Sequence, residues 1–141
     1  MTAVALDTSA AVPYLMSSHH AHGTTRRHLD GRQPVLTEHS LAECYSVITR
    51  LPGDARVTPA DAVELIDANF GTTALLDPAE AGALHRVLAP LGVAGGAVYD
   101  ALVGLAARSN GLPLATRDLR AAATYAAIGV AIDMIEEPRD P

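Results

Sequence analysis

Four acidic side chains occupy positions at which divalent-metal chemistry is possible. Asp7 and Asp118 each follow a short apolar segment, and Glu43 and Asp100 fall within segments of helical periodicity. Carboxylate oxygens are preferred ligands of hard cations such as Mg²⁺ and Mn²⁺. If folding gathers these four side chains, the site could hold an ion that makes hydroxide available near neutral pH.

Three of the four acids also have simpler explanations when each is taken alone. Asp7 could cap a helix that opens at Ser9, and Asp118 could cap one that opens at Leu119. Glu43 lies on the polar side of its helix, where a solvated or ion-paired glutamate is ordinary. Each of these three positions alone is therefore weak evidence for a metal site, and only the set of acids indicates one.

Asp100 is harder to explain as a surface residue. It is the only charged residue between positions 95 and 107. At 100° per residue it lies opposite the apolar stripe and among small side chains such as Ala97 and Gly104. A lone carboxylate on such a face indicates a packed surface with one compensated charge, because an uncompensated one is costly to bury.

Short apolar segments alternate with helical ones along the chain, which predicts a three-layer α/β fold with a parallel sheet covered on both faces. Ligand sites in such sheets form beyond the carboxyl ends of the strands. We expect helices starting at the caps Thr37, Thr58 and Asp77, and an irregular polar stretch containing His19, His20, His22 and His28. The five expected strands are residues 3–6, 34–37, 72–76, 112–116 and 130–134.

Length and composition exclude several classes of protein. The 141 residues predict one domain over 1–135 with a short tail over 136–141. The net charge of −6 argues against a broad basic surface for nucleic acid, so any RNA contact must be local. No apolar stretch approaches the roughly 20 residues of a membrane span, so we expect a cytoplasmic protein.

The absence of lysine and of certain motifs narrows the enzyme classes further. All 10 cationic side chains are Arg, whereas receiver-type and haloacid-dehalogenase-type phosphoacceptors usually need a Lys. No dinucleotide fingerprint or phosphate-binding loop is present. The single cysteine, Cys44, cannot form an internal disulfide and falls on an apolar helix face, where packing is expected.

Four short motifs together resemble the PIN-domain ribonucleases, and among them the bacterial VapC toxins of toxin–antitoxin pairs. Each motif is weak alone, but their order and spacing extend over nearly the whole chain. The motifs are Leu6-Asp7-Thr8-Ser9-Ala10, Leu41-Ala42-Glu43 with Arg50-Leu51, Tyr99-Asp100-Ala101-Leu102, and Ala115-Thr116-Arg117-Asp118.

The resemblance implies a parallel sheet of about five strands in the order 3-2-1-4-5 and a site that cleaves RNA phosphodiesters, leaving a 5′-phosphate and a 3′-hydroxyl. Many relatives carry a further carboxylate shortly after the last motif aspartate, whereas this chain has Leu119-Arg120-Ala121. The implied ligands of Mg²⁺ or Mn²⁺ are Asp7, Glu43, Asp100 and Asp118, with supporting roles for Thr8, Ser9 and Thr116.

The resemblance also implies partners: an RNA substrate, a VapB-type antitoxin whose tail crosses the acidic cleft, and a second copy in a homodimer. Arg117 and Arg120 flank Asp118 and are the candidates for holding the RNA backbone. The alternative interpretation is a catalytically inactive PIN-like module, in which the acids only cap helices or bind an arginine of a partner.

Overall fold

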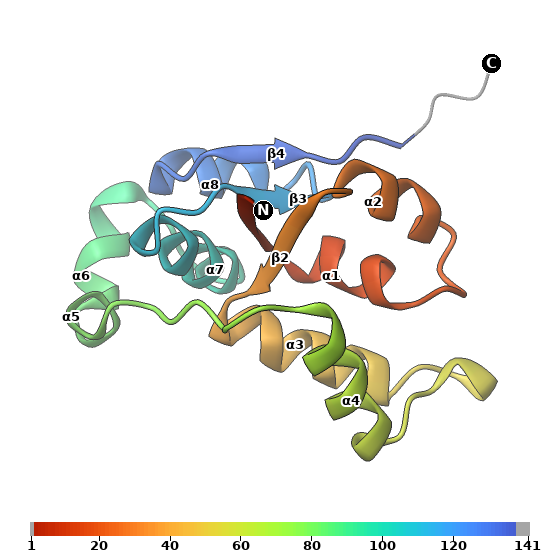
Figure 1. The fold of residues 1–141 in the computed structure, drawn as a ribbon. Coiled ribbons are helices and arrows are strands. Elements are labelled where there is room, and N and C mark those ends of the chain that lie inside the picture. The colour runs from red at the N-terminus through yellow and green to blue at the C-terminus, as the bar shows by residue number, and fades with distance from the viewer. Residues whose placement is uncertain (1, 138–141) are drawn as a thin grey trace.

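Four parallel strands form the central sheet, in the order β2-β1-β3-β4 (Figure 1). They are β1 (Thr2–Leu6), β2 (Arg32–Leu36), β3 (Leu114–Thr116) and β4 (Ile132–Met134). The computed structural model describes residues 2–137, so most of the predicted tail over 136–141 lies outside the described residues. The expected α/β class and the placement of the first strand beside the fourth expected one are confirmed.

The expected five-strand order 3-2-1-4-5 needs a correction, because the predicted strand over 72–76 is reduced to one bridge. Ala74 pairs with Thr37 in parallel on the outer side of β2. The ladder then stops, since the backbone N–H of Leu76 donates to the Glu38 carboxylate at 2.7 Å instead of to a strand. The segment therefore has the predicted position without becoming a strand.

The side chains of β1 alternate between the two faces of the sheet, as a buried strand requires. Leu6 and its β3 partner Ala115 belong to the core on one face, with α1 (Thr8–Leu15) and α3 (Glu38–Thr49). Ala5 and its partner Leu114 belong to the core on the other face. Helices on both faces give the three layers that were predicted.

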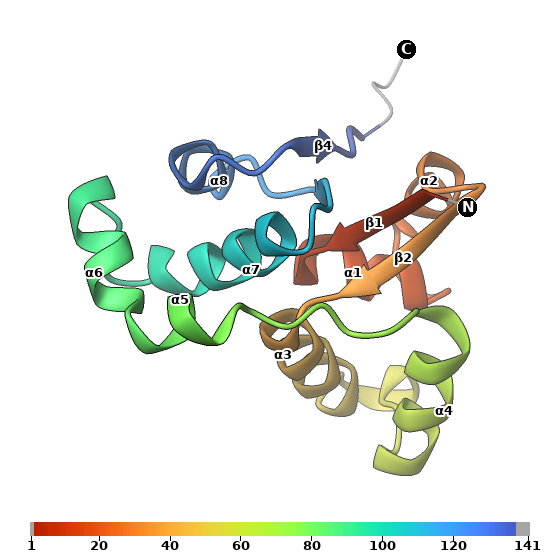
Figure 2. The ribbon, with the colours of Figure 1, turned by 60° about the vertical axis from the view of Figure 1, so that its left-hand side comes forward.

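The remaining helices surround this sheet. Figures 1 and 2 show α5 and α6 at one end of the molecule and α2 at the other. The remaining helices are α2 (His22–His28), α4 (Pro59–Asn69), α5 (Pro78–Gly82), α6 (Leu84–Leu88), α7 (Ala97–Ser109) and α8 (Ala122–Ile128), with 3₁₀ turns η1 (Gly53–Ala55) and η2 (Ala89–Leu91).

Most helix starts follow the predicted caps. Thr37 forms a capping box with Ser40, and Thr58 and Asp77 each accept a backbone N–H of the first turn. Two expectations were wrong. Residues 22–28 are helical rather than irregular, although no side chain caps this helix. The last helix begins at Ala122 rather than at Leu119.

Two small residues are buried where helices pack closely, one on α7 and one on α3. Gly104 of α7 permits close packing, because a Cβ there would lie 3.3 Å from the Tyr125 ring of α8. Cys44 is fully buried in the core, and burial raises the pKa of its thiol to about 12, which confirms the packing role. No helix within residues 2–137 is long and apolar enough to cross a bilayer.

Candidate active site

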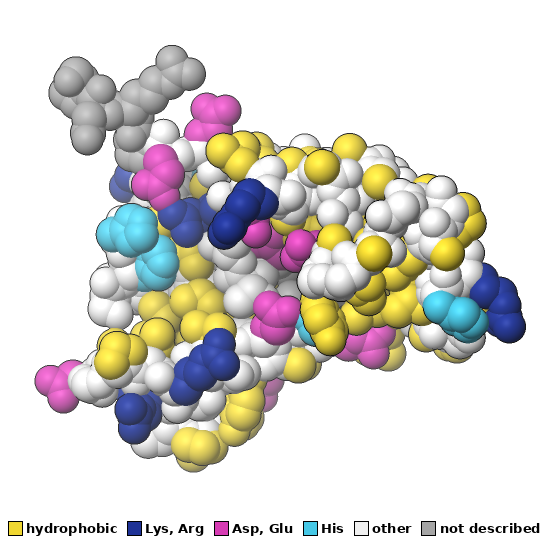
Figure 3. Space-filling view, turned by 180° about the vertical axis from the view of Figure 1, so that it is seen from behind, with side chains coloured by type: hydrophobic (Ala, Val, Ile, Leu, Met, Phe, Trp, Pro, Cys, Tyr) yellow, Lys and Arg dark blue, Asp and Glu magenta, His cyan; other side chains and the backbone are white. Residues whose placement is uncertain are grey.

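The four predicted acids line a single cavity of about 100 Å³. Asp7 follows β1, Asp118 follows β3, Glu43 comes from α3 and Asp100 from α7. Because β1 and β3 are hydrogen-bonded neighbours, their carboxyl ends bring Asp7 and Asp118 to the same edge of the sheet. Figure 3 shows acidic side chains gathered in a hollow of one face, with cationic side chains beside them.

Asp7 is the most fully hydrogen-bonded of the four carboxylates. Its Oδ1 accepts from the Ser9 hydroxyl at 2.6 Å and from the Ala10 N–H at 3.2 Å. Its Oδ2 accepts from the hydroxyls of Thr116 and Tyr125. Only 5% of Asp7 is exposed, and burial raises the pKa of its carboxyl, although the four donors lower it in part. The helix-cap interpretation of Asp7 is thus correct, but it accounts for only one of these bonds.

Backbone N–H groups orient the two hydroxyls that hold Asp7. The N–H of Arg117 donates to Ser9 Oγ at 2.9 Å, and the N–H of Asp118 donates to Thr116 Oγ1 at 3.0 Å. Each hydroxyl is therefore free to direct its own proton at the carboxylate. The segment from Thr116 to Asp118 thus fixes both its own acid and the acid at the end of β1.

Glu43 is held by neighbours on two elements. Thr8 of α1 donates to its Oε2 at 2.9 Å, and His39, one turn earlier on α3, contacts its Oε1. Thr8, Ser9 and Thr116, the supporting residues that the family resemblance implied, all lie at the site.

Sequence reasoning missed Tyr125, which lines the cavity and donates to Asp7 Oδ2 at 2.8 Å. It is 1% exposed. Burial is the main cause that raises the pKa of its phenol, and the negative charge of the nearby Asp7 carboxylate raises it further. The only sequence signal was an aromatic hydroxyl in an otherwise alanine-rich helix. The facing Gly104, which makes room for the ring, is distant in sequence.

Asp100 experiences the combined charge of the cluster. Burial raises the pKa of its carboxyl, and Asp118, Asp7 and Glu43 raise it further, while His39 opposes them. No hydrogen bond to the Asp100 carboxylate occurs within residues 2–137. Asp100 is half-buried, so the packed face that the sequence predicted is only partly observed, and the predicted compensating partner is missing among the described side chains.

The acids share a cavity without being drawn into one coordination sphere. Across residues 2–137, no three side chains among His, Cys, Asp and Glu lie close enough to hold one ion. Repulsion between uncompensated carboxylates favours such spacing. The donor set nevertheless fits a hard divalent cation, because it consists of oxygen ligands whose like charges a cation would offset.

The two predicted RNA-binding arginines flank Asp118 at the cavity. Arg117 contacts the Glu137 carboxylate and lies 3.4 Å from the Ser9 carbonyl oxygen. Arg120 is 98% exposed in its side chain, and its Nε lies 3.9 Å from the Asp118 carboxylate. Asp118 also accepts the backbone N–H of Arg120 at 2.9 Å, which makes a local turn and explains why the following helix starts later than predicted. Arg117 is thus engaged with an acid, whereas the Arg120 side chain extends into solvent.

The sheet and the acidic cavity at the carboxyl ends of its strands define an α/β protein whose site could bind a metal ion. Comparison with known proteins identifies its family. The family model described as the PIN domain matches residues 4–127. The chain belongs to the PIN-domain family.

Individual relatives agree with this assignment. The chain is 48% identical over 127 residues to ribonuclease VapC27 of Mycobacterium tuberculosis, covering 90% of this chain and 93% of that protein. It is 39% identical over 133 residues to ribonuclease VapC40 of the same species, covering 94% and 98%. The fold is similar to that in a crystal structure of VapBC2 from Rickettsia felis bound to promoter DNA, with a TM-score of 0.64 and 12% identity over 96% of this chain and 100% of the other.

Proposed function

We propose that this chain is an endoribonuclease that depends on Mg²⁺ or Mn²⁺ and acts as the toxin of a toxin–antitoxin pair. The observation that carries the proposal is the convergence of Asp7, Glu43, Asp100 and Asp118 on one cavity from four separate segments. The names of the VapC relatives, which are ribonucleases, support RNA as the substrate.

The ligands of the ion would come from these four carboxylates, which would have to move closer together than they lie in the metal-free arrangement, and each is supported differently. Asp7 is fixed by four donors, and Glu43 by Thr8 and His39. Asp100 has no hydrogen-bond partner among the described residues and so has its oxygens free for a ligand. When bound, a divalent ion activates water and stabilises charge on the phosphoryl group. The serine and threonine hydroxyls at the cavity already donate to Asp7 and Glu43, so water, rather than a side chain, would be the attacking group.

In the alternative, an inactive module, helix capping does not account for Asp100, and an arginine of a partner would be needed to explain it. Its carboxylate lies within α7 rather than at a cap, and burial and three neighbouring acids raise its pKa. A charge held in this way costs free energy of folding. A role outside folding, such as binding a cation, explains why the residue is there.

The proposal is tested by titrating Mn²⁺ and Mg²⁺ into the metal-free chain while following cleavage of a panel of structured RNAs and the chain's melting temperature. We expect cleavage only with metal, 5′-phosphate products, and a metal-dependent rise in melting temperature. A chain that cleaves equally well in excess chelator would contradict the metal-dependent mechanism.

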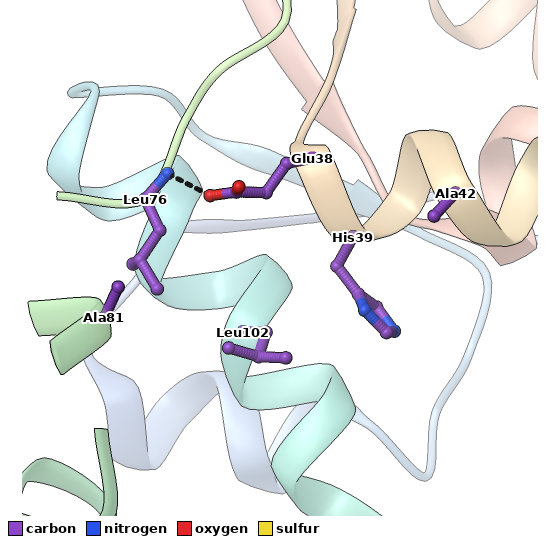
Figure 4. Close-up of a pocket in the computed structure, with 6 residues that line it drawn as sticks. All are labelled: Glu38, His39, Ala42, Leu76, Ala81 and Leu102. Atoms are coloured by element: carbon purple, nitrogen blue, oxygen red, sulfur yellow. Dashed lines mark hydrogen bonds between the residues drawn. The ribbon is translucent and has the colours of Figure 1, made fainter. Parts of the chain in front are cut away.

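A groove beside the acid cavity would suit the antitoxin. Two largely apolar cavities, of about 340 and 350 Å³, lie on either side of α3 and share Glu38 and Ala42. The first is shown in Figure 4, where Glu38 bonds to the Leu76 backbone. The VapBC complex among the structural neighbours supports a VapB-type partner, and the largely apolar linings of these two cavities are our reason for assigning an apolar antitoxin segment to them.

Charge placed in this groove should weaken the antitoxin complex. Val63 is 53% exposed and lines the second cavity, so Val63→Glu would set a carboxylate against the apolar segment. We expect at least about tenfold weaker binding of the cognate antitoxin, measured by calorimetry, because burying a charge is costly. Leu75→Glu is the control, since Leu75 is 62% exposed and lines neither cavity. Equal losses in both variants would place the antitoxin elsewhere.

A further inference from the structure

An exposed aromatic side chain stands immediately before a proposed metal ligand. Tyr99 precedes Asp100 in the first turn of α7 and is 57% exposed. One side of its ring faces His39 of α3, with ring centroids 5.5 Å apart and planes at 18°. The stacked pair joins two elements that both supply acids to the cavity.

The pair lies on the boundary between the acid cavity and the apolar groove. On α7, Val103 and Asp100 line the acid cavity, whereas Leu102 lines the first apolar cavity. At 100° per residue, Tyr99 projects between these two directions. On α3, His39 also belongs to both, because it lines the apolar cavity and contacts the Glu43 carboxylate.

Contacts within the protein orient Tyr99 without covering it. His39 is itself held by Glu43, which fixes the surface on which the phenol ring rests. A ring that is supported on one side and open on the other can accept a further flat group by stacking. The side chain needs no rearrangement to do so.

The charges around the cavity show why such a contact matters for RNA. The chain carries a net charge of −6; Arg117 beside the cavity contacts the Glu137 carboxylate, and the exposed Arg120 lies 3.9 Å from the carboxylate of Asp118. Attraction between phosphates and cations, which dominates most nucleic-acid affinity, is therefore offset here. Stacking of bases on aromatic rings is the other common source of affinity for single strands.

We propose that Tyr99, supported by His39, is a stacking platform for one unpaired nucleobase, and that it positions the adjoining phosphate at the acid cavity. This inference rests on the proposed ribonuclease function and specifies its substrate class as RNA with an unpaired base at the cleavage site. A paired base is stacked on its neighbours and is not available to a side chain, so duplex RNA is disfavoured.

The test measures RNA binding without cleavage. A short fluorescein-labelled oligoadenylate and a fully paired RNA hairpin are titrated with the full chain in EDTA, and fluorescence anisotropy gives each Kd. We expect Tyr99→Ala to weaken oligoadenylate binding about tenfold, and Tyr99→Phe, which keeps the ring, to change it little. Hairpin binding should be weak and similar in all variants.

Leu91→Ala is the control, because Leu91 is also an exposed apolar side chain but lies on η2 and lines neither the acid cavity nor the two apolar cavities. Its oligoadenylate affinity should equal that of the wild type. Equal affinity of Tyr99→Ala and wild type, or equal losses for both RNAs, would overturn the platform. A chain that binds in a Tyr99-dependent way but never cleaves would refute the ribonuclease alone, whereas cleavage with an unchanged KM in Tyr99→Ala would refute the platform alone.

Discussion

Replacing Asp100 with Asn is expected to lower RNA cleavage at least about a hundredfold while making the metal-free chain more stable. Activity falls because the amide removes a charge from the proposed ligand set. Stability rises because the native Asp100 carboxyl is half-buried and lies near the carboxylates of Asp118, Asp7 and Glu43 without a hydrogen-bond partner among the described residues. The amide keeps the shape and removes the repulsion.

The gain in stability should depend on pH in a defined direction. The pKa of Asp100 is higher in the folded chain than its ordinary value, so the native state retains a proton that the unfolded chain releases. The cost of this side chain is therefore absent below the ordinary Asp pKa of about 4 and grows as pH rises through the folded pKa. We expect the melting-temperature difference between Asp100→Asn and wild type to grow over the same range.

Asp30→Asn is the matched control for this experiment, since Asp30 is exposed and outside the acid cavity. Melting in EDTA by differential scanning fluorimetry, with cleavage assays in Mn²⁺, gives both quantities. Saturating Mn²⁺ should make the melting temperature of the wild type higher than that of Asp100→Asn, because the ion stabilises the wild type more. A variant that is less stable than wild type in EDTA at neutral pH would show that Asp100 is not under the electrostatic strain inferred here.

The alternation of strands and helices made most of the fold predictable, because buried parallel strands and capped helices leave local signatures. Thr37, Thr58 and Asp77 begin helices where expected, and each does so through contacts within four residues. The predicted strand over 72–76 does not form, because the backbone N–H of Leu76 donates to the distant Glu38 side chain instead of to a neighbouring strand. The residues around Leu76 give no sign of this hydrogen bond, because its acceptor lies 38 positions away in the sequence.

The site shows the same division between local and distant causes. Asp100 was identifiable because a single charge among small residues is unusual, and Asp7 because it ends a strand. Tyr125 was missed, since its contact with Asp7 spans 118 positions and depends on the space that Gly104 leaves for the ring. Residues that supply ligands were thus visible in the sequence, whereas residues that only orient those ligands were largely not.

Truncating Asp7 to Ala should abolish cleavage and, unlike the Asp100 variant, destabilise the fold by about 2–4 kcal/mol. Burial raises the pKa of both carboxyls, but Asp7 also accepts four hydrogen bonds. Its loss removes the cap of α1 and leaves the buried hydroxyls of Thr116 and Tyr125 without their acceptor. These costs exceed the relief of removing one buried charge.

Asp7→Asn separates the two roles of this carboxylate. The amide oxygen can still accept from Ser9 and Ala10, so the helix cap survives, while the charge is lost. We expect cleavage as low as in Asp7→Ala but a smaller loss of stability, measured by urea unfolding in EDTA. If both variants unfolded at the wild-type urea concentration, the four bonds would contribute nothing to the fold. Asp7 would then be a ligand alone, and the rigidity of the cavity would have to come from the sheet, through the pairing of β1 with β3 that places the carboxyl ends of both strands beside it.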